Sequence, residues 1–538
     1  MSACPGAGTV RAAGHKPAAH ETLPPPEPET RRMTASVFSA SIPPRLATAA
    51  LTLLMAAGCT SLAPDYQRPA LPVPQAYPRD SQPPAGPLDA AQPAAAPASI
   101  AAPAAARIAW QSYFPDPALQ GLIATALENS RDLRAALLRV EEARALYGIQ
   151  RSDQFPTVGV QAQGSRARVP GDLNVTGQPQ VSSQYQVGLG MASWELDFWG
   201  RVRSLSDAAL ENYLSSEAAA QAATLSLIAQ VADGYLRLRE LDERLELTRE
   251  TIDSRAESLR IFRRRFEEGA ISKLDLTQVE TLWQQAKALG TELERSRAAQ
   301  ANTLELLVGA PLDLPPGPAR LNDAAVMPDL PAGLPSDLLT DRPDILAAEH
   351  RLKAANANIG AARAAFLPSI TLTGAFGTAS AELDGLFAGG SRAWNFAPSI
   401  NLPIFDAGRR QSTLDLTEVR RDLAVASYEQ TIQSAFRDVS DALASRRWLA
   451  EQVDVLRATV AAQAERTRLA QLRYDHGASP YLEVLDAKRD LLAAQQQLVE
   501  TRRALLSSRI SLYAALGGGS LAVGAPTTET AQRGQVSR

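Results

Sequence analysis

The chain has 538 residues, with 54 Lys and Arg against 58 Asp and Glu, so its formal net charge is −4. This near-neutral balance argues against a nucleic-acid-binding protein, which would carry a strongly basic face. The two cysteines, Cys4 and Cys59, are too few for a disulfide framework or a multi-cysteine zinc site, and the four histidines argue against a histidine-rich metal enzyme. We therefore expect no nucleic-acid partner, no metal and no catalytic cofactor.

The amino-terminal part of the chain contains a secretion signal. Apolar residues fill 46–57, with Arg45 before them and small residues after them, a pattern typical of a signal peptide and too short to span a bilayer comfortably. Residues 56–59 resemble the bacterial lipobox. That resemblance implies that Cys59 becomes the first mature residue and carries a diacylglycerol and a further acyl chain, which together anchor stably. Thr60 after it favours the outer membrane, and the alternative is a lone buried cysteine that closes an apolar helix.

The segments on either side of this signal differ in composition. Residues 1–32 are rich in Pro, Gly and Glu and fit poorly in front of a signal peptide, which makes Met33 an alternative start. Residues 63–107 are rich in Pro, Ala and Gln, a composition that cannot bury a core. We therefore predict that 59–107 is a lipid-anchored tether that gives the folded body reach from the membrane.

The rest of the chain is a duplication. Gly269 recurs as Gly477, and the same offset of 477 − 269 = 208 superposes residues 200–309 on 408–517 without a gap. Chance similarity between two Ala-rich helices would not keep glycines and turns in step. Each half is therefore one supersecondary unit.

Within each half, the pattern predicts a helix, a pair of strands and a very long helix that turns back at a glycine. A proline-free run whose only glycine is Gly234 extends over 201–268, long enough for a rod of roughly 100 Å. Gly269 and Gly477 stand where a left-handed residue ends a helix. The helices are expected at 118–150, 201–268, 342–366 and 409–476.

Capping residues mark the turn in each half. Ser272 followed three residues later by Asp275 predicts a capping box. Ser479 followed by Pro480 predicts a helix with serine at the N-cap and proline as its first residue. Each half should thus end in an antiparallel helical hairpin with a tight tip.

Four segments alternate between apolar and polar residues, as β-strands do. They are close to the 9–11 residues needed to cross a bilayer at a tilt, with one apolar face and one polar face; a half-buried soluble sheet would have the same period. Four strands cannot close a transmembrane barrel, of which the smallest use about eight, and open edges are not tolerated in lipid. If these strands span a membrane, the chain must form a symmetric oligomer. The strands are expected at about 157–163, 184–194, 369–377 and 394–402.

The layout resembles the TolC-like outer membrane factor family, in its lipoprotein (NodT-type) branch, over roughly 108–517. The resemblance implies a mainly α fold with transmembrane β-structure, in which three chains form a twelve-strand β-barrel on a twelve-helix periplasmic α-barrel. It rests on the two glycine tips and on segments 194–201, 342–345, 365–369 and 404–409.

The family resemblance also implies a gate at the hairpin tips. Glu483 and Asp486 match the acidic residues that ring its constriction, and six carboxylates in a trimer would favour cations. Without the resemblance, they would be solvated acids that complement a helix dipole. Asp275 and Tyr474 match the positions of a link between the two hairpins. Residues 478–479 replace an arginine that some members carry there.

By this resemblance the protein is the exit duct of a tripartite efflux pump for drugs or other small molecules. Its partners would be a periplasmic adaptor (membrane fusion) protein, an inner-membrane RND-type pump and outer membrane lipid. The alternatives are the channel of a protein secretion system and, from another class, a periplasmic adaptor lipoprotein; no catalytic constellation indicates an enzyme. The expected parts are an upstream extension with signal peptide (1–58), the tether (59–107), a first repeat (108–309), a linker (310–335), a second repeat (336–517) and a flexible tail (518–538).

Overall fold

The computed structural model describes residues 61–78, 105–316, 320–327, 330, 338 and 342–520. The chain divides into two units, Met1–Ala57 and Gly58–Arg538, and every described residue belongs to the second. The predicted signal peptide, the alternative start and Cys59 lie outside the described residues. None of the helices in the described ranges has the length and apolarity to cross a membrane.

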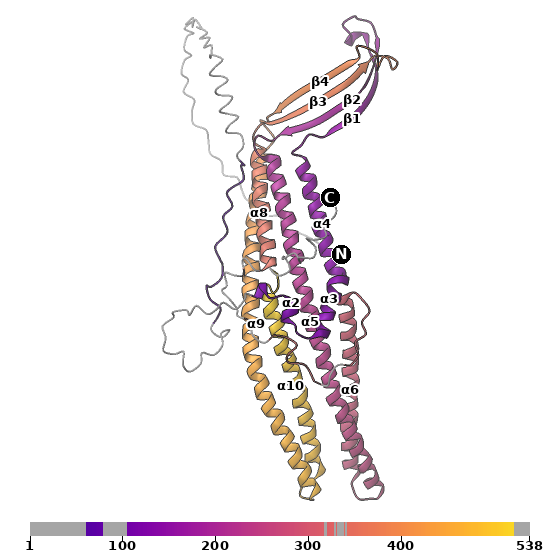
Figure 1. The fold of residues 1–538 in the computed structure, drawn as a ribbon, viewed down its shortest axis with the longest axis vertical. Helices are drawn as coiled ribbons and strands as arrows, with labels where there is room; N and C mark the ends of the chain where they lie inside the picture. The colour runs from indigo at the N-terminus through magenta and orange to yellow at the C-terminus, as the bar shows by residue number, and fades with distance from the viewer. Residues whose placement is uncertain are drawn as a thin grey trace, which may run out of the picture. The chain divides into compact units, whose positions relative to one another are not determined.

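Two helices of 67 residues each dominate the second unit. At 1.5 Å per residue, each is about 100 Å long. The helices α6 and α10 pair with the lower parts of α5 and α9, α4 and α8 lie beside their upper parts, and the sheet lies at the upper end (Figure 1). The predicted duplication is thus visible in the fold. The helices are α2 (Trp110–Tyr113), α3 (Pro117–Asn129), α4 (Arg131–Ser152), α5 (Arg201–Glu267), α6 (Lys273–Val308), α8 (Pro343–Ala364), α9 (Arg409–Asp475) and α10 (Tyr481–Ala515).

The helix predicted over 118–150 is divided in two at Ser130. This residue ends α3 by donating its N–H to the Ala126 carbonyl, and its hydroxyl accepts the Leu133 N–H at the start of α4. The end of α6 presses against this break: a Cβ at Gly309 would lie 2.4 Å from the Asn129 carbonyl oxygen. The kink therefore follows from a capping serine and a tertiary contact, not from a proline.

The four strands form one antiparallel sheet in the order β1-β2-β3-β4, so β2 and β3 join the two repeats. Gly188 and Gly377 face each other at this seam, and a Cβ on Gly377 would lie 2.2 Å from the Val187 carbonyl oxygen. The strands β1, β2 and β3 extend beyond their predicted ranges, because polar pairs such as Arg166 with Ser183 continue the ladder without an apolar pattern, whereas β4 matches its range to within two residues. The strands are β1 (Val158–Val169), β2 (Gln180–Leu196), β3 (Ser369–Ser380) and β4 (Arg392–Asn401).

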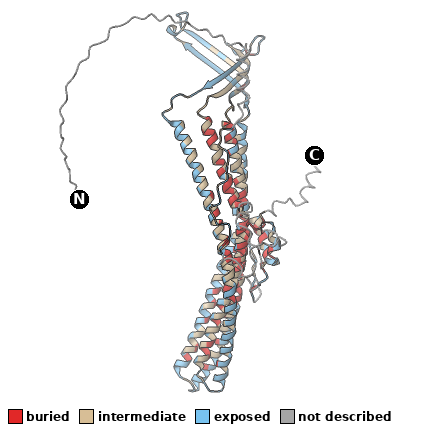
Figure 2. Cartoon of the chain, turned by 90° about the vertical axis from the view of Figure 1, so that its left-hand side faces the viewer, coloured by how far each residue is buried: buried red, intermediate tan, exposed pale blue. Residues whose placement is uncertain are grey.

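No other described part of the chain covers the sheet. Gly190 is the one buried residue of the four strands, and the strands carry the colours of exposed and intermediate residues (Figure 2). Large apolar side chains are open on it, including Val160 at 78% and Trp394 at 77% exposure. A half-buried soluble sheet would bury one face against the protein, and no described element does so here.

The main core lies in the middle of the helical body, where buried residues concentrate (Figure 2). Tyr113 stacks on Tyr513 with ring centroids 4.1 Å apart. Part of the predicted linker enters this core, since Leu321 and Val326 are buried. The first residues of the predicted tail (518–538) also contact the body, because Gly519 donates its N–H to the Ala105 carbonyl.

The tether prediction is wrong for residues 61–78, which pack on the body. The Tyr66 hydroxyl and the Arg68 guanidinium donate to the two carboxylate oxygens of Glu349 on α8, at 3.2 and 2.7 Å. Glu349 is only 3% exposed. Burial would raise the pKa of this carboxyl, but hydrogen bonds from Arg68 and Lys353 outweigh it and hold the pKa below its usual range. The Pro- and Ala-rich composition of this segment could not predict the contact, because it depends on Tyr66 and Arg68 meeting a buried acid of a distant helix.

Candidate gate at the hairpin tips

Both hairpin tips end in the same backbone motif. Gly269 and Gly477 have φ values of +74° and +71°. The residue after each glycine donates its N–H five residues back, and each glycine donates three residues back, as in a Schellman motif. A Cβ would meet nothing within 4 Å at either position, so the left-handed backbone alone requires glycine here.

The two tips differ in how the returning helix begins. Ser272 and Asp275 form the predicted capping box at the start of α6. The prediction for the second tip is wrong by one residue: Pro480 is the N-cap of α10, and the helix begins at Tyr481. The hydroxyl of Ser479 is buried without a hydrogen-bond partner. Pro480 has an extended ψ of 155°, so it cannot be the first helical residue.

The predicted link between Asp275 and Tyr474 is not formed. The Asp275 carboxylate accepts from the Ser272 N–H and hydroxyl, at 3.2 and 2.7 Å, so its local cap occupies it. The Tyr474 hydroxyl instead accepts a hydrogen bond from Arg265 on α5. Arg265 is the last of three consecutive arginines, and its contact therefore joins α5 of the first hairpin to α9 of the second.

Tyr481 connects the two hairpins, and no pattern in the sequence predicted this role. Its ring lies against Phe262 of α5 and Tyr474 of α9, with centroids 4.6 and 4.8 Å away. Its hydroxyl is 2.8 Å from the Ser258 hydroxyl. Burial raises the pKa of Tyr481. The contact between hairpins is therefore an aromatic cluster with polar contacts at its edge, and not a carboxylate–phenol pair.

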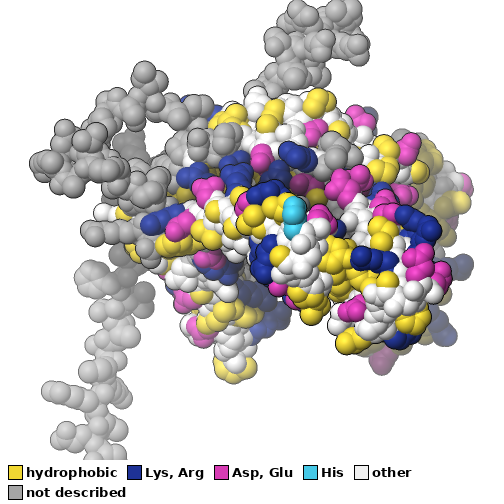
Figure 3. Space-filling view, turned by 90° about the horizontal axis from the view of Figure 1, so that it is seen from below, with side chains coloured by type: hydrophobic (Ala, Val, Ile, Leu, Met, Phe, Trp, Pro, Cys, Tyr) yellow, Lys and Arg dark blue, Asp and Glu magenta, His cyan; other side chains and the backbone are white. Residues whose placement is uncertain are grey.

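The two predicted gate acids lie on the first turns of α10, each beside an arginine of the same chain. Glu483 Oε2 is 3.4 Å from Arg473 Nη1, and Asp486 Oδ1 is 3.1 Å from Arg489 Nη1. The acidic side chains keep 45% and 39% of their surface exposed. Seen from below, basic and acidic side chains alternate over the helical ends (Figure 3).

Further positive charge lies between the hairpins at Lys488, two residues after Asp486 on α10. Lys488 donates to the Ser254 hydroxyl at 3.4 Å. Burial and the nearby Arg255 guanidinium lower the pKa of Lys488, and burial also lowers the pKa of Arg255. The acidic residues of the second tip are thus surrounded by basic side chains of the same chain.

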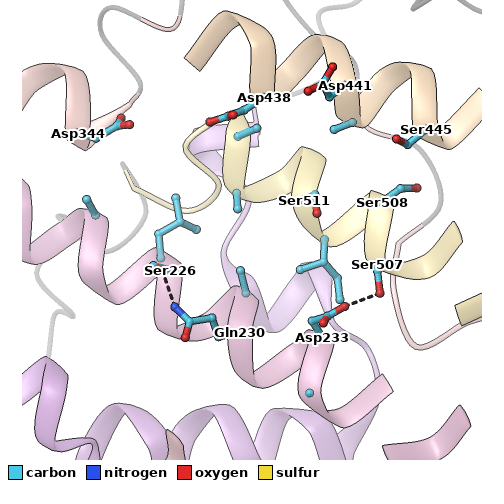
Figure 4. Close-up of a pocket in the computed structure, with 18 of the residues that line it drawn as sticks. Ser226, Gln230, Asp233, Asp344, Asp438, Asp441, Ser445, Ser507, Ser508 and Ser511 are labelled. Atoms are coloured by element: carbon cyan, nitrogen blue, oxygen red, sulfur yellow. Dashed lines mark hydrogen bonds between the residues drawn. The ribbon is translucent and has the colours of Figure 1, made fainter. Parts of the chain in front are cut away.

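A large open hollow of about 1050 Å³ lies higher up, between α5, α6, α9, α10 and the start of α8 (Figure 4). Asp233 and Asp441, which are equivalent in the two repeats, both line it, together with several serines. Ser507 donates to the Asp233 carboxylate, and Ser226 accepts from Gln230 at 2.8 Å. Among the described residues, no group of three or more His, Cys, Asp or Glu could hold a metal ion. The wall of the hollow thus combines these polar side chains with apolar ones such as Leu225 and Ile510.

The sequence matches the family model described as outer membrane efflux protein over residues 122–310 and 334–518. The toluene efflux pump outer membrane protein TtgC of Pseudomonas putida is 46% identical over 472 residues, which cover 87% of this chain and 94% of that protein. Outer membrane protein OprJ of Pseudomonas aeruginosa is 42% identical over 479 residues, covering 88% and 96%.

Solved structures show the same architecture. A membrane protein from Pseudomonas aeruginosa has a TM-score of 0.77 and 41% identity, over 85% of this chain and all of the other. The open state of the MtrE outer membrane channel of Neisseria gonorrhoeae has a TM-score of 0.74 and 40% identity, over 86% and 98%. The likeness spans both repeats.

Proposed function

Because the chain belongs to the outer membrane efflux protein family, we propose that it is the passive exit duct of a tripartite efflux pump. The observation that carries this proposal is the sheet: four antiparallel strands with two open edges and exposed apolar side chains, at the end of two long helical hairpins. An open sheet edge is not stable in lipid. The sheet is therefore one part of a larger closed barrel.

Three chains would close it. With four strands each, they would supply twelve, with β1 of one chain pairing with β4 of the next. The same symmetry would arrange α5, α6, α9 and α10 into a tunnel of about 100 Å, long enough for much of the periplasm. The acyl chains on Cys59 would hold each chain to the outer membrane.

The partners in this proposal are a periplasmic adaptor protein at the hairpin tips and an inner-membrane RND-type pump that supplies the energy. The relatives support small organic molecules as cargo, since the name of one of them specifies toluene. The duct is a conduit and not an enzyme. Its hollow, lined by both apolar side chains and serine and aspartate side chains, suits the passage of small organic molecules.

The gate in this proposal lies at the tips around Gly269 and Gly477. Glu483 and Asp486 would face the constriction, and Tyr474 and Tyr481 would hold the two hairpins of one chain together. Opening would then require the ring of Tyr481 to separate from Phe262, together with the polar contacts between the hairpins that accompany this packing.

The test is single-channel conductance of the detergent-extracted protein in planar bilayers, with the oligomer mass measured on the same sample. A trimer with small, mostly closed conductance is expected. A Cys59→Ala variant should still require detergent, because the barrel and not the lipid keeps it in the membrane. A water-soluble monomer without conductance would overturn the proposal and favour an adaptor lipoprotein.

A further inference from the structure

The second hairpin tip brings an arginine and a proposed gate acid together across its turn. Arg473 is in the last turns of α9, and Glu483 is in the first turn of α10. The salt bridge of 3.4 Å between them spans the glycine turn. Two backbone hydrogen bonds close that turn, from Gly477 and Ala478. Any ring that three Glu483 carboxylates form must therefore contain three Arg473 guanidinium groups close by.

The first tip has the same two residue types in equivalent positions but uses them differently. Subtracting the repeat offset of 208 places Arg265 opposite Arg473 and Asp275 opposite Glu483. Arg265 donates to Tyr474 in the other hairpin, while Asp275 is held in its capping box. An arginine–acid pair between these two equivalent positions is thus particular to the second hairpin, which carries the proposed gate; in the first hairpin a different pair, Arg263 with Glu280 at 3.3 Å, links α5 to α6.

We propose that Arg473 determines the ion selectivity of the mouth by cancelling the charge of Glu483. This inference rests on the proposed function. In each chain three acids, Glu483, Asp486 and Asp490, lie within salt-bridge distance of three arginines, Arg473, Arg489 and Arg466, and Arg489 is shared between Asp486 and Asp490. The net charge at the tip end of the channel, which we call the mouth, is consequently close to zero. In place of the expected acidic cation filter, the mouth should discriminate only weakly between cations and anions.

The exposure of the pair argues for this role over a structural one. Arg473 and Glu483 keep 58% and 45% of their side-chain surface open to water. Exposed ion pairs contribute little to stability because water screens them. Their charges nevertheless act on a permeating ion, since one unit charge at roughly 7 Å in water changes the local ion concentration about threefold.

The experiment compares reversal potentials in a KCl gradient for Arg473→Gln, Arg473→Lys, Glu483→Gln and Arg468→Gln. Arg468 is a matched control: it is also exposed on α9, and it pairs with Glu465 away from the gate acids. Low salt keeps the Debye length near 10 Å at about 0.1 M. Arg473→Gln should raise the cation-to-anion permeability ratio about threefold or more, and Glu483→Gln should lower it. Arg473→Lys and Arg468→Gln should match the wild type.

The outcomes separate this inference from the proposed function. If Glu483→Gln changes selectivity but Arg473→Gln does not, the role of Arg473 is wrong and the gate stands. If neither variant changes the ratio in a conducting channel, the gate assignment fails together with the inference. If the wild type does not conduct, the exit-duct proposal itself is overturned.

Discussion

Charged residues in the middle of the helical body and at the hairpin tips have opposite surroundings. Glu240 and Glu349 are 0% and 3% exposed, and each accepts hydrogen bonds from basic residues of distant segments. At the tips, Glu483 and Arg473 keep about half of their surface in water. Removing one partner of a buried pair costs about 3–5 kcal/mol, whereas an exposed pair contributes about 0.2–1 kcal/mol. Ion pairs therefore stabilise the middle of the body strongly and the hairpin tips only weakly.

The largest effect is expected at Glu349. Glu349→Ala removes the acceptor of Tyr66 and Arg68 and should lower the free energy of unfolding by about 3–5 kcal/mol. Thermal denaturation followed by circular dichroism in detergent measures it. Glu141→Ala, an exposed helical acid with a partner 3.9 Å away, is the control and should change stability little. Equal stability of both variants would contradict the difference between buried and exposed charged residues on which this comparison rests.

The same pair gives a pH dependence. The pKa of Glu349 is depressed in the folded protein, so its contribution is complete above the unfolded value of about 4.3 and is lost as pH falls through the folded pKa. Wild type should therefore lose its advantage over Glu349→Gln under acidic conditions. A difference that stays constant down to about pH 3 would show that ionisation of Glu349 is not the cause.

At the tips, Tyr481 should have the next largest effect. Tyr481→Ala removes the ring contacts to Phe262 and Tyr474 and the bond to Ser258, which together contribute about 1–3 kcal/mol. Single-channel recordings should show a higher open fraction, while the melting temperature of the middle changes little. Tyr481→Phe keeps the ring and should have the smaller effect. An unchanged open fraction in Tyr481→Ala would place the contact that closes the tips elsewhere.

Gly477→Ala tests the turn itself. Alanine at φ +71° costs about 1–2 kcal/mol, and no side-chain clash adds to it. Gly148→Ala is the opposite control, because Gly148 is inside α4 with open space around it and alanine there should stabilise the helix by about 1 kcal/mol. Protease sensitivity of the tip measures the first change, and a tip as resistant as wild type would contradict it.

The smallest effects distinguish the two tips. Ser272→Ala removes a capping box and should cost about 1 kcal/mol locally. Ser479→Ala removes a buried hydroxyl without a partner and should be neutral or slightly stabilising. Hydrogen exchange at the first turns of α6 and α10 compares them directly. Equal exchange rates in the two variants would mean that Ser479 caps α10 after all.

Local signals predicted the long helices well. The expected run of 201–268 became Arg201–Glu267, because the absence of proline and a left-handed glycine at the end are properties of neighbouring residues. The strand centres were also correct. Several of their ends were not, since backbone pairing carries polar residues such as Arg166 into the ladder where the apolar alternation stops.

The contact between the hairpins could not be predicted in the same way. Arg265 and Tyr474 are 209 residues apart and meet only because the two hairpins pack side by side. Asp275 had two possible partners, and the nearer one, Ser272, is favoured because its cap needs no tertiary contact. Sequence spacing also could not show that Arg473 would fold back onto Glu483.

The sequence alone determined the duplication, the length of the rods, the glycine turns and the alternation of the strands, because each follows from the conformational preferences of residues close together in the chain. The tertiary structure decided which charges are buried, which hairpin contacts which and where the amino-terminal segment docks. These depend on packing between segments hundreds of residues apart, and there burial changes the energy of a charge far more than any local preference does.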